Sequence, residues 1–124
     1  MEFLVDSSVW VALFLDFDTQ HEKAARAISH INGPIFTPYC VIVEVATVLA
    51  YKHSKAQADA FLGYLSENRD IALIENVIEE EIMFYRSITK NVSFTDSSLI
   101  FLAKKLDARL ITFDLELARI AKSM

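Results

Sequence analysis

Cysteine, glycine and proline are scarce in this 124-residue chain, which contains one cysteine, two glycines and two prolines. A single cysteine excludes an internal disulfide and fits a reducing compartment, so we expect a soluble cytoplasmic protein. So few glycines and prolines leave little room for long irregular loops, while a 53% share of hydrophobic residues is enough to build a core. We therefore expect one compact domain over residues 1–124, without a linker or an internal repeat.

Positive charge is also in short supply, because 12 Lys and Arg residues face 17 Asp and Glu residues and the net charge is −5. Proteins that hold nucleic acid through their overall electrostatic field are usually basic. A broad nucleic-acid-binding face is therefore excluded. Any role on nucleic acid must depend on a local site and on bridging metal ions.

Long uncharged hydrophobic runs are missing as well. The apolar stretch from Phe3 to Phe17 carries Asp6 and lacks both the positive segment and the cleavage site of a signal peptide. The apolar stretch from Pro38 to Tyr51 is too short to span a membrane and is interrupted by Glu44. We expect neither a signal peptide nor contact with a membrane.

Short apolar runs that end in polar or turn residues alternate with helical patterns along the chain. The runs predict strands at 3–5, 35–36, 71–74 and 110–113. Apolar spacing and capping residues predict helices at 9–17, 19–31, 38–51, 54–68, 76–88, 95–106 and 115–122. This alternation predicts the α/β class, with a small, parallel, doubly wound sheet and helices on both faces.

The helix over 38–51 contains a charge that needs an explanation. Thr37 is a suitable N-cap, and Pro38 suits the first helical position. Almost every following side chain is apolar, so we expect this helix to be buried on all sides. Glu44 is its only charge before Lys52, and a lone buried carboxylate is costly unless it takes up a proton or meets a cation. Glu44 is therefore expected to face a cation.

Three further acids occupy equivalent places in the predicted topology. Asp6 and Asp114 each follow a strand and precede a helix, and Asp96 lies in the first turn of a helix. Taken singly, each is well explained as an N-cap or as a favourable charge near the positive end of a helix dipole. In a doubly wound sheet, however, the carboxyl ends of the strands and the following helix N-termini share one edge. We expect the three aspartates at that edge, with Glu44 beside them.

Such a cluster of four carboxylates predicts a metal site. Clustered carboxylates repel one another, and Mg²⁺ or Mn²⁺ removes that conflict because hard divalent cations take oxygen ligands. One or two such ions would also hold a phosphate oxygen and activate a water for attack. Thr112 could hydrogen-bond a metal-bound carboxylate. The other candidate groups have simpler structural explanations as surface histidines, a packing cysteine and turn-forming serines: His21, His30, His53, Cys40, Ser7 and Ser8.

Several segments resemble the PIN-domain ribonucleases, in particular the VapC toxins of bacterial and archaeal type II toxin–antitoxin pairs. The segments that carry the resemblance are Val5–Val9, His21 with Ala24, Thr37–Val45 and Asp96–Asp114. They cover essentially the whole chain, in order. Two positions depart from the family pattern: relatives often have Gly near Asp107 or Ala108, and many have Phe in place of Leu117.

The resemblance implies a metal site made of Asp6, Glu44, Asp96 and Asp114, with Asp6 and Asp96 as the most direct ligands and Thr112 as an auxiliary residue. It also implies a Mg²⁺- or Mn²⁺-dependent endoribonuclease, a hydrolase that forms a homodimer and is inhibited by a cognate antitoxin protein. Two alternatives stay open. The chain could be a catalytically silent protein-binding module, or a metal-dependent phosphatase or DNA nuclease that uses the same acids.

Overall fold

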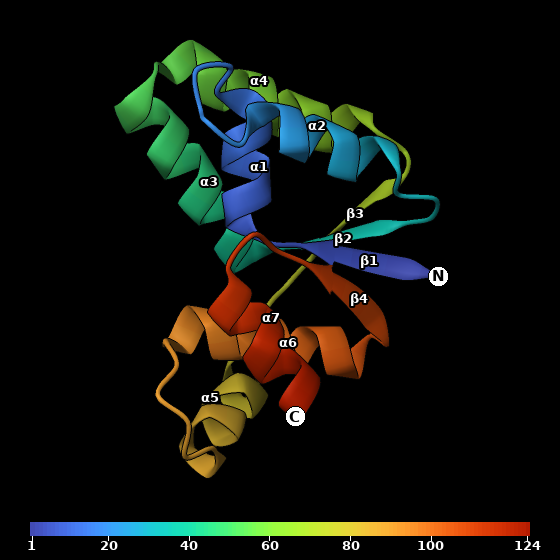
Figure 1. Cartoon of the computed structure of the whole chain (residues 1–124), viewed down its shortest axis with the longest axis vertical. Helices are drawn as coiled ribbons and strands as arrows, with labels where there is room; N and C mark the ends of the chain where they lie inside the picture. The colour runs from blue at the N-terminus through green and yellow to red at the C-terminus, as the bar shows by residue number, and fades with distance from the viewer.

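The computed structural model describes residues 1–124 as four strands and seven helices that alternate along the chain (Figure 1). The strands are β1 (Glu2–Val5), β2 (Ile35–Pro38), β3 (Ile71–Ile74) and β4 (Ala108–Ile111). The helices are α1 (Ser7–Phe14), α2 (His21–Ser29), α3 (Tyr39–Lys52), α4 (Lys55–Glu67), α5 (Ile78–Ser87), α6 (Phe94–Lys105) and α7 (Leu115–Ser123). None of these helices is both long enough and apolar enough to cross a membrane.

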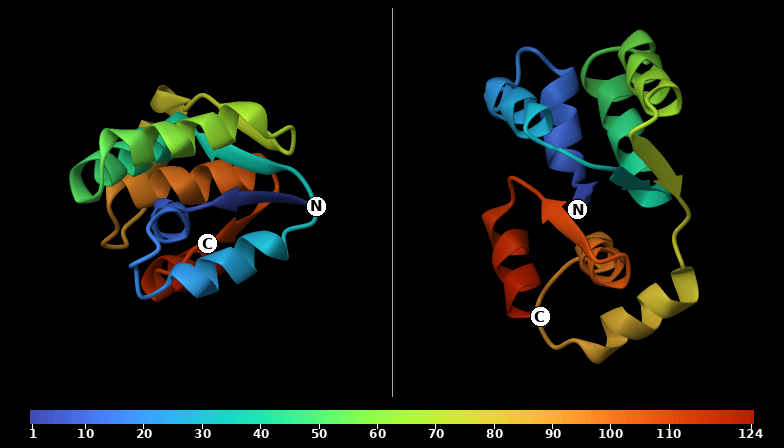
Figure 2. Two further views of the ribbon diagram at one scale, coloured as in Figure 1. Left: turned by 90° about the horizontal axis from the view of Figure 1, so that it is seen from above. Right: turned by 90° about the vertical axis from the view of Figure 1, so that its right-hand side faces the viewer.

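The four strands form one parallel sheet in the order β3-β2-β1-β4. Leu4 in the middle of β1 lies opposite Phe36 of β2 on one side and Leu110 of β4 on the other. Helices α1 to α4 cover one face of the sheet and α5 to α7 cover the other (Figures 1 and 2). The predicted α/β class, the parallel sheet and the helices on both faces are therefore confirmed.

The chain adds β2 and β3 on one side of β1 and then crosses over to add β4 on the other side. This reversal places a crevice outside the carboxyl ends of β1 and β4, which is where open α/β sheets bind their ligands. Asp6 follows β1, and Asp114 comes shortly after β4. The topology thus brings Asp6, from the beginning of the sequence, and Asp114, from near its end, to the same edge of the sheet.

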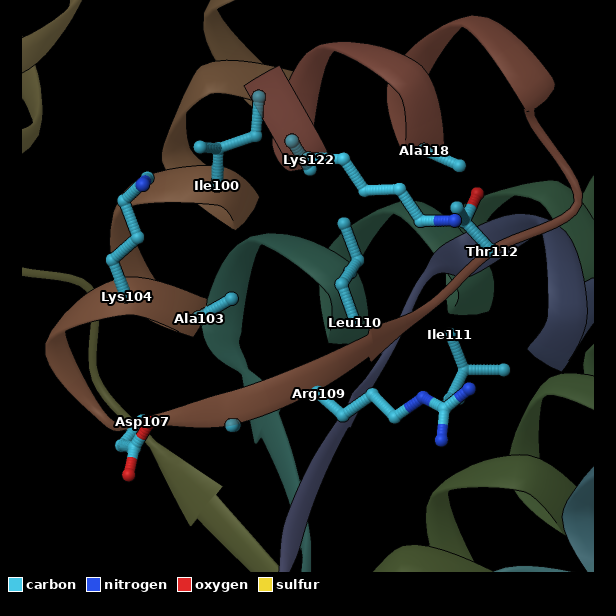
Figure 3. A pocket seen from close by; sticks show the side chains of 12 residues that line it. Ile100, Ala103, Lys104, Asp107, Arg109, Leu110, Ile111, Thr112, Ala118 and Lys122 are labelled. Carbon is cyan, nitrogen blue, oxygen red and sulfur yellow. The ribbon is translucent and has the colours of Figure 1, made fainter. Parts of the chain in front are cut away.

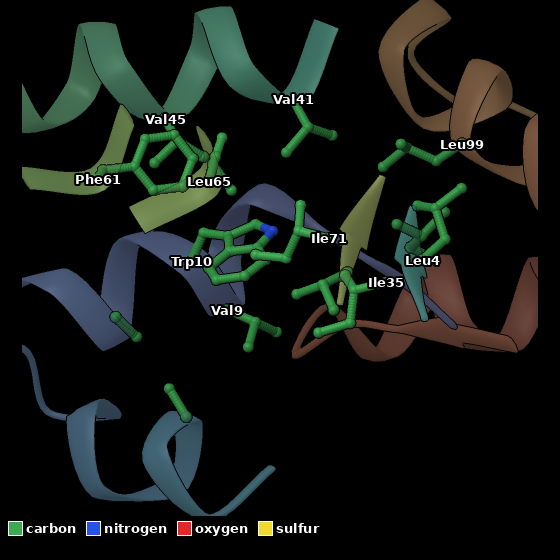
Figure 4. Close-up of a cluster of buried hydrophobic side chains, with 14 of the residues drawn as sticks. Leu4, Val9, Trp10, Ile35, Val41, Val45, Phe61, Leu65, Ile71 and Leu99 are labelled. Atoms are coloured by element: carbon green, nitrogen blue, oxygen red, sulfur yellow. The ribbon is translucent and has the colours of Figure 1, made fainter. Parts of the chain in front are cut away.

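A core of aromatic and branched side chains fixes α1 against the sheet and its neighbouring helices (Figure 4). Trp10 is fully buried, and its ring meets the ring of Phe61 edge-on at a centroid distance of 5.8 Å. Val9 and Val45 are also fully buried beside it. Burial of side chains of this size stabilises the fold by roughly 1.5–3 kcal/mol each, so the turn that precedes α1 and carries Asp6 is firmly held.

Helix α3 differs from the prediction that it is buried on all sides. Only one face of it is buried, formed by Val41, Val45 and Leu49, while Tyr39 and Val43 are exposed. The reason is that α3 packs on α1, α4 and β2, and no other element covers its outer face. An apolar composition therefore did not indicate burial here.

The start of α3 differs as well. Thr37 was expected to cap this helix, but it is the third residue of β2 and is fully buried, while Pro38 occupies the cap position. One of the first helical amides is instead satisfied by a residue distant in sequence, because Asn76 accepts a hydrogen bond from the backbone N–H of Cys40 at 2.9 Å. Burial raises the pKa of the Cys40 thiol, which agrees with its interpretation as a packing residue.

Helix α5 corrects a second expectation. Asn76 was expected to cap it and a broad apolar face was expected to be buried, but Val77 is the cap residue and only Glu81 of this helix is buried. The Glu81 carboxylate accepts hydrogen bonds from the Asn76 amide at 2.9 Å and from the Val77 N–H at 2.6 Å. Ile82 and Met83 are exposed. A polar side chain therefore anchors this helix, and of its apolar side chains Phe84 packs partly on the core while the others are exposed.

Local capping explains the smaller differences. Ser54 caps α4 as predicted, with its hydroxyl 3.1 Å from the Gln57 N–H. Ser93 rather than Thr95 caps α6, so that helix begins before the predicted cap. Helix α2 starts without the predicted Thr19 cap, and α1 ends at Phe14 instead of residue 17. Strand β4 ends at Ile111, which leaves residues 112 and 113 in the turn that follows.

Candidate functional site

Asp6 is held in one orientation where β1 meets α1. Its side chain is 6% exposed and caps α1, because one carboxylate oxygen accepts the Ser7 backbone N–H at 2.7 Å. The other oxygen accepts the hydroxyls of Ser8 at 3.0 Å and Thr112 at 2.7 Å. The N-cap interpretation is correct for Asp6, but the capping bond uses only one of its two oxygens.

Thr112 and Ser8 join the carboxyl ends of β1 and β4. The Thr112 hydroxyl donates to Asp6 and accepts the backbone N–H of Asp114 at 3.0 Å. The Ser8 hydroxyl likewise donates to Asp6 and accepts the backbone N–H of Phe113 at 3.4 Å. Ser8 was interpreted from the sequence as a turn former only. The contact of Ser8 with Asp6 could have been expected from the sequence, because Ser8 lies two residues after an aspartate that follows a strand.

Asp114 caps α7 with a single oxygen. That oxygen accepts the backbone N–H groups of Glu116 at 3.0 Å and Leu117 at 3.1 Å. The side chain is otherwise exposed. Asp114 is therefore both an N-cap and a carboxylate with an oxygen available to a ligand at the edge of the sheet.

Asp96 lies in the first turn of α6, where its backbone N–H donates to the Ser93 hydroxyl at 3.1 Å. Burial is the main cause that raises the pKa of Asp96, followed by the negative charge of Asp6, while a hydrogen bond with Ser93 lowers it. The charges of Asp114 and Glu44 raise the pKa further. All four predicted acids therefore lie close enough for three of them to act on the fourth.

Glu44 occupies the second turn of α3 and is exposed, so the prediction that it is a buried charge is wrong. It lines a hollow of about 330 Å³ together with Ser7 and Ser8, the residues that follow Asp6. Asp18 lines the same hollow. No sequence pattern indicated Asp18, because it lies in the loop between α1 and α2 and its position depends on the tertiary fold.

The donor set of this edge fits a hard divalent cation. No group of three or more His, Cys, Asp or Glu side chains adopts the spacing of a metal site. The acids nevertheless act on one another electrostatically, and every charge that acts on Asp96 is negative. A cation with oxygen ligands would relieve this repulsion. Asp6, Glu44, Asp96 and Asp114 are the residues that could hold it.

Comparisons with known proteins agree with this fold. The sequence model of the PIN domain matches residues 3–123. No curated protein matches the chain in a sequence search. The fold is similar to that of VapC20 from Mycobacterium tuberculosis, a toxin that cleaves the sarcin-ricin loop, with a TM-score of 0.84 and 20% identity over 95% of this chain and 94% of that chain. PIN domains generally bind a divalent metal. The chain belongs to the PIN-domain family.

Proposed function

We propose that this protein is a Mg²⁺- or Mn²⁺-dependent endoribonuclease and the toxin of a toxin–antitoxin pair. The observation that carries the proposal is the placement of Asp6 and Asp114 at the carboxyl ends of β1 and β4, where the Thr112 hydroxyl joins the Asp6 carboxylate to the Asp114 backbone. The negative charges of Asp6, Asp114 and Glu44 raise the pKa of Asp96, after the larger effect of burial, and this supports the same site. Membership of the PIN-domain family and the fold shared with a VapC toxin support it.

Each residue of the cluster has a defined role in this proposal. Asp6 and Asp96 are the most direct metal ligands, and Glu44 and Asp114 complete the negative environment. Thr112 is a positioning residue, because its hydroxyl fixes the Asp6 carboxylate through a 2.7 Å hydrogen bond. The chemistry that a divalent ion supplies when bound is the activation of a water and of the scissile phosphate. In the overall reaction, the water oxygen bonds to phosphorus, the bond to the leaving sugar oxygen breaks, and that oxygen takes a proton.

Replacement of Asp96 by Asn tests the proposal most simply. Asp96→Asn keeps the shape of the side chain and removes its charge, so we expect cleavage of a fluorescent RNA in Mn²⁺ to fall on the order of 100-fold or more. Asp70→Asn is the matched control, since Asp70 is exposed in the loop before β3 and has no contact with the cluster. Wild-type cleavage rates in Asp96→Asn would show that the assignment is wrong.

The same assay separates the alternatives. A phosphatase or a DNA nuclease would prefer a small phosphoester or single-stranded DNA when these are offered beside RNA. A silent binding module would cleave none of them and would show no thermal shift with Mn²⁺.

We further propose a second copy of the chain and a cognate antitoxin as partners. Exposed apolar side chains on α3 and α5, among them Tyr39, Val43 and Met83, support protein–protein contacts. Light scattering at micromolar concentration should give the mass of a dimer, and a monomeric mass would contradict the proposed self-association.

A further inference from the structure

Strand β4 has an unpaired edge. It pairs only with β1, so its other side is the free edge of the sheet. The carbonyl of Ile111 accepts the backbone N–H of Asp6 at 2.9 Å, so Ile111 and, two residues earlier, Arg109 direct their backbone groups toward β1. Because backbone direction alternates along a strand, the N–H and C=O groups of Ala108 and Leu110 point outward. These groups are available to another strand.

A hollow of about 540 Å³ runs along this edge (Figure 3). Every residue from Asp107 to Thr112 lines it. Successive side chains of a strand point to opposite faces of the sheet, so a hollow that touches all of them must follow the edge itself. In Figure 3, Leu110 points toward α6 and α7, whereas Arg109 extends on the opposite side of the strand. The small side chains of Ala103 on α6 and of Ala118 and Ala121 on α7 leave the hollow open.

The charge around this hollow is positive, in contrast to the net charge of the chain. Lys104, Arg109 and Lys122 line it, and all three are exposed. None of them takes part in the three ion pairs of the protein, and Asp107 is the single acid in the lining. A ligand with negative side chains would therefore meet cations that have no ion-pair partner.

We propose that the edge of β4 binds an extended, acidic segment of another polypeptide as a fifth strand of the sheet. Main-chain hydrogen bonds to Ala108 and Leu110 would supply affinity, and alternate apolar side chains of the segment would enter the hollow. Its acidic side chains, on the opposite face of the added strand, would meet Arg109. This surface meets the proposed metal site only at Thr112, and its test does not depend on cleavage.

Two features favour this occupant over the other candidates. A second copy of the chain paired through β4 would bring two identical sets of cations together, which disfavours that pairing. An RNA strand would match the cations, but it would have no use for an apolar floor or for the alternating N–H and C=O groups of Ala108 and Leu110.

A synthetic eight-residue peptide of alternating Val and Glu, capped at both ends, is the probe. We would follow amide hydrogen exchange of the full-length protein by NMR and peptide binding by fluorescence anisotropy. The peptide should slow exchange at Ala108 and Leu110 by about tenfold or more, while Arg109 and Ile111, which already face β1, should change little. No added protection at a millimolar concentration of the peptide would overturn the proposal.

Two controls test the main chain and the charge separately. The same peptide with N-methyl groups on alternate residues cannot form the ladder, so its binding should be lost. Arg109→Glu should weaken binding of the Val/Glu peptide by about threefold to tenfold and strengthen binding of a Val/Lys peptide, since one charge pair is reversed. Lys52→Glu, on the distant end of α3, makes the same charge change and should have no effect.

Three results would overturn the proposal. Equal binding of the N-methylated peptide would exclude strand addition. Protection of Ala108 and Leu110 that grows with protein concentration alone would assign the edge to a second copy. Protection by a short RNA but not by the Val/Glu peptide would assign the surface to nucleic acid.

Discussion

At the scale of single residues, Asp96 links the candidate site to the stability of the protein. Burial, followed by the charge of Asp6, raises the pKa of Asp96, so the folded protein keeps a proton that the unfolded chain has already lost. The unfolded state then binds fewer protons, and linkage makes the free energy of unfolding fall as pH rises from about 3.9 through the raised pKa. Without metal, Asp96 should therefore destabilise the protein at neutral pH.

Urea unfolding in EDTA, at a series of pH values from 4 to 7, checks this sign. The free energy of unfolding of the wild type minus that of Asp96→Asn should decrease with pH, and the variant should be the more stable protein at pH 7. A difference that stays constant or increases with pH would show that the other acids do not act on Asp96 as described.

Thr112 provides a second prediction at this scale. Thr112→Val preserves the shape of the side chain and removes its hydrogen bond to the almost fully buried Asp6 carboxylate. The free energy of unfolding should fall by roughly 1.5–3 kcal/mol, as expected for a hydrogen bond to a charged group. Thr112→Ser keeps the hydroxyl and should lose less than half of that amount. Equal losses in the two variants would assign the effect to packing.

The site residues were predictable to different degrees. Asp6 and Asp114 follow strands, so position in the sequence was sufficient to place both at the carboxyl edge of the sheet. The contact of Ser8 with Asp6 is local, but its contact with Phe113 joins two loops more than 100 residues apart, and no local pattern encodes it. Glu44 was expected to face a cation for a wrong reason, because its helix is covered on only one face and the side chain is exposed.

At the scale of secondary structure, the two glycines differ in whether a Cβ atom could be added. Gly33, in the turn before β2, has a φ of +151°, and a Cβ there would collide with the carbonyl oxygen of Met1. Gly63 lies within α4, and a Cβ there would meet no atom within 4 Å. Gly33→Ala should destabilise the protein by roughly 3 kcal/mol, whereas Gly63→Ala should stabilise it by about 1 kcal/mol.

Urea unfolding of both variants measures this difference, and each serves as the control for the other. A loss of stability in Gly63→Ala, or none in Gly33→Ala, would contradict the described geometry.

Predictions for the elements succeeded where local sequence determines the outcome. The Ser54 cap and the strand over 71–74 depend on residues that are adjacent in the chain, and both are confirmed. The burial predicted for α3 and α5 was wrong, because an apolar side chain is buried only where another element covers it. The burial of the charged side chain of Glu81 was not predicted either, since it depends on hydrogen bonds from Asn76 and Val77.

At the scale of the whole molecule, the crossover from β3 to β4 determines where the candidate site lies. It brings residues from the beginning, the middle and the end of the chain to one edge of the sheet. Alternating strands and helices were enough to predict this edge, since parallel sheets follow general rules of connection. The detailed spacing of the carboxylates was not predictable in this way, because it depends on side-chain rotamers and on the repulsion among the acids.

The central claim is that the four carboxylates converge to bind a divalent cation, and thermal unfolding tests it most directly. The melting temperature of the wild type and of Asp70→Asn should rise by several degrees when EDTA is replaced by saturating Mn²⁺, because a ligand at about 100 times its Kd stabilises the folded state by roughly 2.7 kcal/mol. Asp96→Asn should start from a higher melting temperature in EDTA and gain little from Mn²⁺. No shift in the wild type, or an equal shift in Asp96→Asn, would contradict the claim.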